Sequence, residues 1–84
     1  MYYVYIIKSI KNGSLYIGCT GDLQKRFKMH NQGMSFHTKK YVPWILVYYE
    51  AYRSKTDAYN REGALKLHAQ GLRRLKERLL ESLR

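Results

Sequence analysis

The sequence is short of acidic side chains and of long apolar segments. Sixteen Lys or Arg residues stand against six Asp or Glu residues, which gives a formal net charge of +10. This excess favours a polyanionic partner, nucleic acid before an anionic membrane. No apolar run approaches the roughly 20 residues of a membrane-spanning helix, and Met1 leads directly into a strand-like run instead of a signal peptide. We therefore expect no membrane association.

Cysteine and proline are also scarce, with one residue of each. A lone Cys19 excludes an intramolecular disulfide and a cysteine-rich zinc site, and it fits a reducing, cytoplasmic location. We interpret Cys19 as a buried small residue. The 84 residues carry no repeat or low-complexity tract. They predict one domain, residues 1–84.

The chain begins with the pattern of a β-hairpin. Tyrosine and β-branched residues fill positions 2–8, and Asn12-Gly13 predicts a two-residue turn before a second strand over 14–18. In that register Ser9 faces Tyr16. Alternation then gives an aliphatic face and a tyrosine face, the latter comprising Tyr3, Tyr5, Ile7, Tyr16 and Gly18. We expect the aliphatic face to pack on helices and the tyrosine face to be a binding surface.

Helices and one further strand follow. Asp22 can cap a helix that runs to about Asn31 and ends at Gly33. A basic loop over 33–43 precedes a strand over 44–52. The order β-β-α-β-α-α predicts an α+β fold, in which helices pack on a three-stranded mixed or antiparallel sheet.

The C-terminal third predicts two helices. Ser54 resembles the first residue of a capping box, and the helix after it should run to about Gln70, with Gly71 in a left-handed conformation beyond its end. Its buried stripe is Ala58, Leu65 and Ala69. A last amphipathic helix carries Leu72, Leu75, Leu79 and Leu83, which either cap the domain's own core or bind a partner.

Glu62 lies at the edge of a buried stripe in a strongly basic chain. One interpretation is an ion pair with Lys66 or Arg61. The other is a hard-metal ligand, because Mg²⁺ commonly binds one or two carboxylates, several waters and substrate phosphate oxygens.

Other polar and aromatic residues also allow both a structural and a functional interpretation. Arg26 and His30 share a helix face that either is solvated or binds phosphate. Tyr5 and Tyr16 are either core aromatics or a site that stacks bases and positions a water. His37 and His68 are interpreted as surface residues.

In combination these residues resemble the GIY-YIG nuclease superfamily, especially its small standalone bacterial members. Tyr3-Val4-Tyr5 stands where the family name has Gly-Ile-Tyr, and Tyr16-Ile17-Gly18 matches the second triplet. The later matches are Arg26, His30-Asn31, Pro43-Trp44, Val47-Tyr48-Tyr49-Glu50, Ala58 and Arg61-Glu62. The resemblance covers about residues 2–67.

The resemblance implies an endonuclease that hydrolyses DNA with a single divalent metal, Mg²⁺ or Mn²⁺, as in DNA repair or recombination. Glu62 matches the metal ligand, and Tyr5 the general base or the group that orients water. Tyr16 matches the tyrosine that assists it, and Arg26 the arginine on the scissile phosphate. His30 matches a histidine that contacts phosphate or accepts a proton.

The chain departs from better-known members near the end of the site. They carry an asparagine after the glutamate helix, where this sequence reads His68-Ala69-Gln70-Gly71. It also lacks the lysine- and serine-rich segment of the standalone members, and reads Leu72-Arg73-Arg74 there. No separate DNA-binding domain is present in this sequence, so we expect specificity to be low or to come from a partner.

Three functions remain to be compared: a nuclease, a non-catalytic nucleic-acid-binding module on the same fold, and an interaction protein that uses its last helix. DNA is the expected partner, and the sequence does not distinguish it from RNA. The sequence does not determine the oligomeric state, and a monomer is one possibility. The expected phosphate contacts are Lys25, Lys28, Lys39, Lys40, Arg53 and Lys55, extended by Arg73, Arg74, Lys76 and Arg78.

Overall fold

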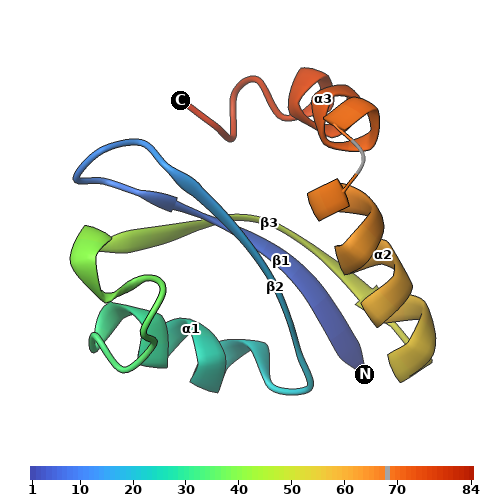
Figure 1. The fold of residues 1–84 in the computed structure, drawn as a ribbon, viewed down its shortest axis with the longest axis horizontal. Helices are drawn as coiled ribbons and strands as arrows, with labels where there is room; N and C mark the ends of the chain where they lie inside the picture. Colours follow the sequence, from blue (N-terminus) through green and yellow to red (C-terminus); the bar gives the residue numbers. More distant parts are fainter. Residues whose placement is uncertain (68) are drawn as a thin grey trace.

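The computed structural model describes residues 1–67 and 69–84, and it contains one sheet flanked by helices (Figure 1). The elements in chain order are β1 (Tyr2–Ser9), β2 (Leu15–Thr20), α1 (Leu23–Asn31), the short 3₁₀ helix η1 (Lys39–Tyr41), β3 (Trp44–Tyr52), α2 (Lys55–Leu67) and α3 (Ala69–Arg78). The strand order is β2-β1-β3, and both pairings are antiparallel. The α+β prediction is confirmed, and its sheet is antiparallel throughout the described residues.

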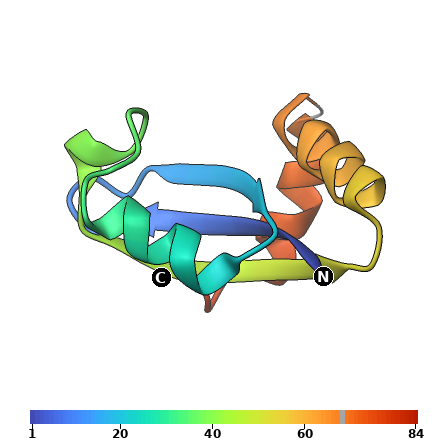
Figure 2. The same ribbon diagram turned by 90° about the horizontal axis from the view of Figure 1, so that it is seen from below.

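The two faces of the sheet carry separate apolar clusters. On the aliphatic face, residues of α2 and α3 cover Val4, Ile6 and Ile17. On the tyrosine face, α1 and the segment before β3 cover Tyr5 and Ile7. Figure 2 shows α1 lying across the sheet in front of the strands, with α2 and α3 on the other side of the molecule.

The predicted hairpin register is wrong by two residues, although the division into faces is confirmed. Tyr5 pairs with Gly18 and Ile7 with Tyr16, so the connection is longer than two residues. The Ser9 hydroxyl accepts hydrogen bonds from the backbone N–H groups of Lys11 (3.1 Å) and Asn12 (3.2 Å). These bonds satisfy the backbone of a wider turn, which the Asn-Gly pair alone does not predict. Because the shift is even, every side chain keeps its predicted face.

The tyrosine face is not the open surface that alternation suggests. Tyr5 is 1% exposed and Ile7 is fully buried, because Leu23 and Phe27 of α1 and the Trp44 side chain cover them. Alternation within the hairpin shows only which side chains share a face. It does not indicate that α1 covers this face.

The helix ends follow local capping, with one exception. The Asp22 carboxylate accepts from the Lys25 N–H at 3.1 Å, and Gly33 adopts φ 73° after α1. The Ser54 hydroxyl accepts from the Asp57 N–H at 3.3 Å. Gly71 is not a left-handed terminator, since it lies inside α3, which begins at Ala69 and not at Leu72. His68 and the side chain of Ala69 lie outside the described residues.

Three of the four C-terminal leucines pack on the protein's own core, although α3 ends at Arg78, before Leu79 and Leu83. Leu75 is 3% exposed, and Leu72 and Leu79 pack against the same cluster. This removes the surface on which the interaction-protein hypothesis depended. No helix in the described part of the chain is long and apolar enough to cross a membrane.

A polar cluster ties β3 to α2 on the aliphatic face. The Arg61 guanidinium binds the Glu50 carboxylate through two hydrogen bonds of 2.9 and 3.0 Å. The Tyr48 and Tyr52 hydroxyls donate to the same carboxylate. Arg61 therefore serves Glu50 and is not the partner of Glu62.

Candidate active site

The centre of the candidate site is the Tyr5 hydroxyl on β1. Its Oη lies 2.8 Å from His30 Nε2, and His30 Nδ1 lies 2.8 Å from Thr38 Oγ1. His30 and Thr38 are both fully buried. The Trp44 indole N–H donates to the Thr38 carbonyl at 2.9 Å. One continuous chain of hydrogen bonds therefore fixes the tyrosine ring and attaches the loop after α1 to it.

His30 is neutral in this chain of hydrogen bonds. Burial, followed by the nearby Arg26 guanidinium, lowers the pKa of His30 to about 4. A neutral imidazole has one N–H donor, and the Thr38 hydroxyl can donate or accept. The protons can therefore run from Tyr5 towards Thr38 or in the opposite direction. In the second arrangement the Tyr5 proton is free to point out of the network.

Tyr5 is a neutral phenol at neutral pH. Burial raises its pKa to about 12, while the adjacent Arg26 lowers it and Tyr16 and Glu62 raise it. Tyr5, Arg26, Tyr16 and Glu62 come from β1, α1, β2 and α2, respectively. Polar groups from elements that are separate in sequence thus influence the pKa of the same hydroxyl.

Gly18 makes the position of the Tyr5 ring possible. It lies opposite Tyr5 in the β1–β2 register. A Cβ atom at position 18 would lie 2.3 Å from Tyr5 Oη and 2.4 Å from Cζ. The last residue of the Tyr-Ile-Gly triplet is therefore small because the phenol ring lies directly against its backbone.

Tyr16 forms the other wall of the site. Its ring meets the His30 ring edge-on, with centroids 5.2 Å apart, and lies 6.5 Å from the Trp44 ring. The Lys66 ammonium lies 5.8 Å from the Tyr16 ring centroid. Helix α2 thus reaches the tyrosine face at the sheet edge that β2 forms.

Glu62 on α2 is partly buried and paired. Its carboxylate lies 3.2 Å from Lys66 Nζ, and its side chain is 18% exposed. The simpler interpretation of the sequence, an ion pair at i+4, is confirmed. The described residues contain no group of three His, Cys, Asp or Glu side chains arranged to hold a metal. One carboxylate fits only a cation that takes its other ligands from water and phosphate, as Mg²⁺ commonly does.

Arg26 and His30 occupy different depths on α1. Arg26 is partly exposed beside Tyr5, whereas His30 is fully buried behind it. A phosphate can reach Arg26. The suggestion that His30 contacts phosphate does not fit this burial, and its effect must pass through Tyr5.

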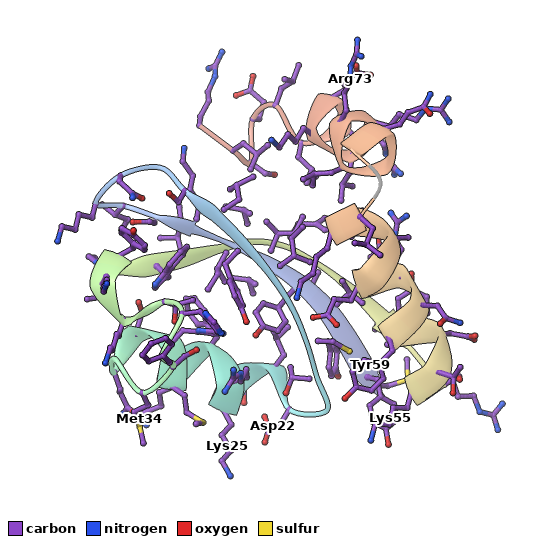
Figure 3. The ribbon with its side chains drawn as sticks, viewed as in Figure 1. Asp22, Lys25, Met34, Lys55, Tyr59 and Arg73 are labelled. Carbon is purple, nitrogen blue, oxygen red and sulfur yellow. The ribbon has the colours of Figure 1, made fainter. Side chains whose placement is uncertain are left out.

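The expected phosphate contacts all have exposed side chains: Lys25, Lys28, Lys39, Lys40, Arg53 and Lys55. Lys25 on α1 and Lys55 at the start of α2 lie at one end of the molecule, and Arg73 on α3 lies at the other end (Figure 3). The cations of α3 are therefore not a continuation of the surface around Lys25 and Lys55.

Two residues at the site had no assigned role in the sequence. Thr38 lies in an irregular loop, and no local pattern indicated that it would bind His30. The Asn31 side chain accepts from the Trp44 N–H (2.5 Å) and donates to the Trp44 carbonyl (2.9 Å). It thereby attaches the end of α1 to the start of β3. The His30-Asn31 pair carried the only signal for this second contact.

Comparisons with known proteins show the family of this chain. A family model described as the GIY-YIG catalytic domain matches residues 1–76. A UPF0213 protein of Clostridium perfringens is 45% identical over 67 residues, covering 79% of this chain and 71% of its own length. One of Staphylococcus haemolyticus is 40% identical over 80 residues, covering 92% and 96%. The solution NMR structure of a UPF0213 protein from Bacillus halodurans superposes with a TM-score of 0.55 at 37% identity, covering 96% of this chain and 84% of that one.

Proposed function

This chain belongs to the GIY-YIG family, and we propose that residues 1–84 form one divalent-metal-dependent endonuclease domain that hydrolyses DNA phosphodiester bonds. The observation that carries the proposal is that Tyr16 connects the two halves of the site: its ring contacts His30, which bonds the buried Tyr5 hydroxyl, and Lys66, which pairs with Glu62. A protein that only binds nucleic acid has no chemical need for this arrangement. The net charge of +10 supports a polyanionic substrate.

Arg26 is the residue that receives the scissile phosphate in this proposal. Its guanidinium offers a planar fork of N–H donors that matches phosphate oxygens. It lies near Tyr5 on α1, from where it would stabilise the charge that develops on the phosphate.

Tyr5 positions the attacking water. A phenol with a pKa of about 12 is not a base in the resting protein. It accepts a hydrogen bond from water through Oη while its own proton points towards His30 Nε2, 2.8 Å away. Tyr5 can take a proton from this water only as it passes its own proton to His30 Nε2, and a nearby cation makes that loss easier because it favours the phenolate.

Glu62 is the residue that would hold the metal, with Lys66 released from it. When bound, Mg²⁺ or Mn²⁺ would supply Lewis-acid stabilisation of the phosphate and leaving-group oxygens. Tyr16 keeps this half of the site in place through its contacts with His30 and Lys66. We propose a role in DNA repair or recombination in the cytoplasm.

The test is cleavage of labelled single-stranded, duplex and branched DNA, and of RNA, with Mg²⁺, Mn²⁺ or EDTA. Glu62→Gln removes the negative charge with little change in shape. We expect it to lose cleavage by at least about 100-fold, because metal stabilisation contributes several kcal/mol to the barrier. Glu77→Gln is the matched control, since Glu77 is an exposed α3 residue paired with Arg73.

Two results would contradict the proposal. One is cleavage that survives in Glu62→Gln or in EDTA. The other is an absence of cleavage on every substrate, together with salt-sensitive binding that is equal in the wild-type and Glu62→Gln proteins. The second result would favour the non-catalytic binding module.

A further inference from the structure

The loop of residues 33–38, called here the Phe36 loop, is held firmly from the inside. The Ser35 carbonyl accepts hydrogen bonds from the N–H groups of Thr38 (3.2 Å) and Lys39 (3.0 Å). Ser35 is 7% exposed and Thr38 is fully buried. Because Thr38 also binds His30, the base of the loop is part of the network that holds Tyr5.

The same loop presents an aromatic ring outwards. Phe36 is 76% exposed, more than any other aromatic residue in the described part of the chain. The Lys39 ammonium lies 5.1 Å from its ring centroid, and the His37 ring meets it edge-on at 5.5 Å. An apolar ring beside a cation is the combination that binds a nucleobase and the phosphate next to it.

Helix α2 repeats this combination on the other side of the site. Tyr59 is 52% exposed, and the Lys55 ammonium lies 5.6 Å from its ring centroid. Tyr59 stands one helical turn before Glu62, on the same stripe of α2 as Glu62 and Lys66. This second ring therefore borders the candidate metal ligand.

The two aromatic–lysine pairs stand on opposite sides of the catalytic residues. Figure 2 shows the loop after α1 and helix α2 both extending past the edge of the sheet that β2 forms, with β2 between them. Tyr16 on β2 lies between the two, since it contacts His30 of α1 and Lys66 of α2. A nucleic-acid strand that runs across the site from the Phe36 loop to helix α2 passes over Tyr5 and Tyr16.

We propose that Phe36 and Tyr59 each stack on a base of the bound strand, and that single-stranded nucleic acid is therefore the preferred substrate class. This inference rests on the proposed function only in taking nucleic acid as the ligand. A protein ring stacks on a base most readily where that base is unpaired, because both faces of a base inside a duplex are already stacked and separating them costs a few kcal/mol per step. Lys39 and Lys55 supply the neighbouring phosphate contacts.

The test measures binding without cleavage, in a Glu62→Gln background. Fluorescence anisotropy gives the affinity for an oligo-dT strand and for a duplex of the same length at one fixed salt concentration. We expect Phe36→Ala and Tyr59→Ala each to weaken single-strand binding by about 10-fold, within the range for one stacked base. Duplex binding should change by less than about twofold, because phosphate contacts dominate it.

Matched variants separate stacking from charge and from exposed apolar area. Tyr49→Ala removes a ring that is 53% exposed but lies on β3, at the opposite edge of the sheet and without a lysine over it. It should leave both affinities unchanged. Lys40→Ala should weaken single-strand and duplex binding by the same factor, as the loss of a phosphate contact does.

A spectroscopic readout tests stacking directly. In Phe36→Trp, oligo-dT should quench the fluorescence of the introduced indole, whereas the 3%-exposed Trp44 contributes a constant background. The inference is overturned if the strand does not quench the emission of the introduced indole, or if Phe36→Ala weakens single-strand and duplex binding equally. Because no cleavage is measured, these outcomes are independent of whether the wild-type protein cuts DNA.

Discussion

Replacing Gly18 with alanine should disrupt the centre of the site by steric contact alone. The added Cβ would meet Tyr5 Oη at 2.3 Å, Cζ at 2.4 Å and Cε1 at 2.8 Å. Ordinary carbon contacts need about 3.5 Å or more, so the ring must move by about 1 Å. Tyr5 is 1% exposed, and no free space is available in its present position.

The magnitude follows from the contacts that the ring would lose. Forcing extra volume into a packed core costs about 1–3 kcal/mol. Moving the hydroxyl away from His30 Nε2, now at 2.8 Å, leaves buried polar groups unpaired and costs about 1–3 kcal/mol more. We therefore expect Gly18→Ala to lower the free energy of unfolding by about 2–5 kcal/mol, a large part of what a chain of this size has.

Urea unfolding measures this free energy, and two comparisons make the result specific. Gly63→Ala adds the same methyl group inside α2, where a Cβ meets nothing within 4 Å, and should stabilise the protein by up to about 1 kcal/mol. In a Tyr5→Ala background, the Gly18→Ala change should cost almost nothing, because the ring is absent. A loss below about 0.5 kcal/mol in the wild-type background, or an equal loss in both backgrounds, would refute the steric argument.

Two further predictions concern protonation and charge. Because the pKa of His30 falls from 6.5 to about 4 on folding, the unfolded chain binds more protons between these values, so stability should decrease by about 3 kcal/mol as the pH falls through this window. Urea unfolding of His30→Gln across the window should show a shallower slope, and an unchanged slope would argue against a neutral, buried His30. Glu50→Gln should lower the free energy of unfolding by about 1–2 kcal/mol, because it replaces the charge-assisted hydrogen bonds to the partly exposed Arg61 by a neutral one. Cleavage by the folded Glu50→Gln protein should stay within about twofold of wild type, since Glu50 lies on the other face of the sheet from Tyr5; a larger loss would contradict that separation.

The strands and caps were predictable because their causes are local. A run of tyrosine and β-branched residues favours a strand at β1 whatever the partner strand is, and Asp22 caps α1 through a bond to a residue three positions later. Side-chain facing was also predictable, because a strand has a period of two and an even register error preserves it. The prediction that Tyr5 and Tyr16 lie on one face is therefore correct, although the predicted length of the hairpin turn is wrong.

The features that were missed depend on contacts distant in sequence. The burial of Tyr5 requires α1 to lie over the sheet, and Thr38 meets His30 only after the loop has folded back. Gly71 was misplaced for a related reason. Tertiary packing of Leu72 and Leu75 against the core offsets the roughly 1 kcal/mol by which glycine disfavours a helix interior.

The site therefore consists of a fixed half and an exchangeable half. Tyr5, His30 and Thr38 are buried, and each hydrogen bond between them would be expensive to break. The Glu62–Lys66 ion pair, in contrast, is partly exposed and easily broken. Lys66 is 46% exposed, and an i,i+4 pair of this kind contributes only about 0.3–0.5 kcal/mol. In the proposed function, Lys66 can therefore release Glu62 to a divalent cation with a small loss of free energy, while the buried hydrogen bonds keep Tyr5 in place to position the attacking water.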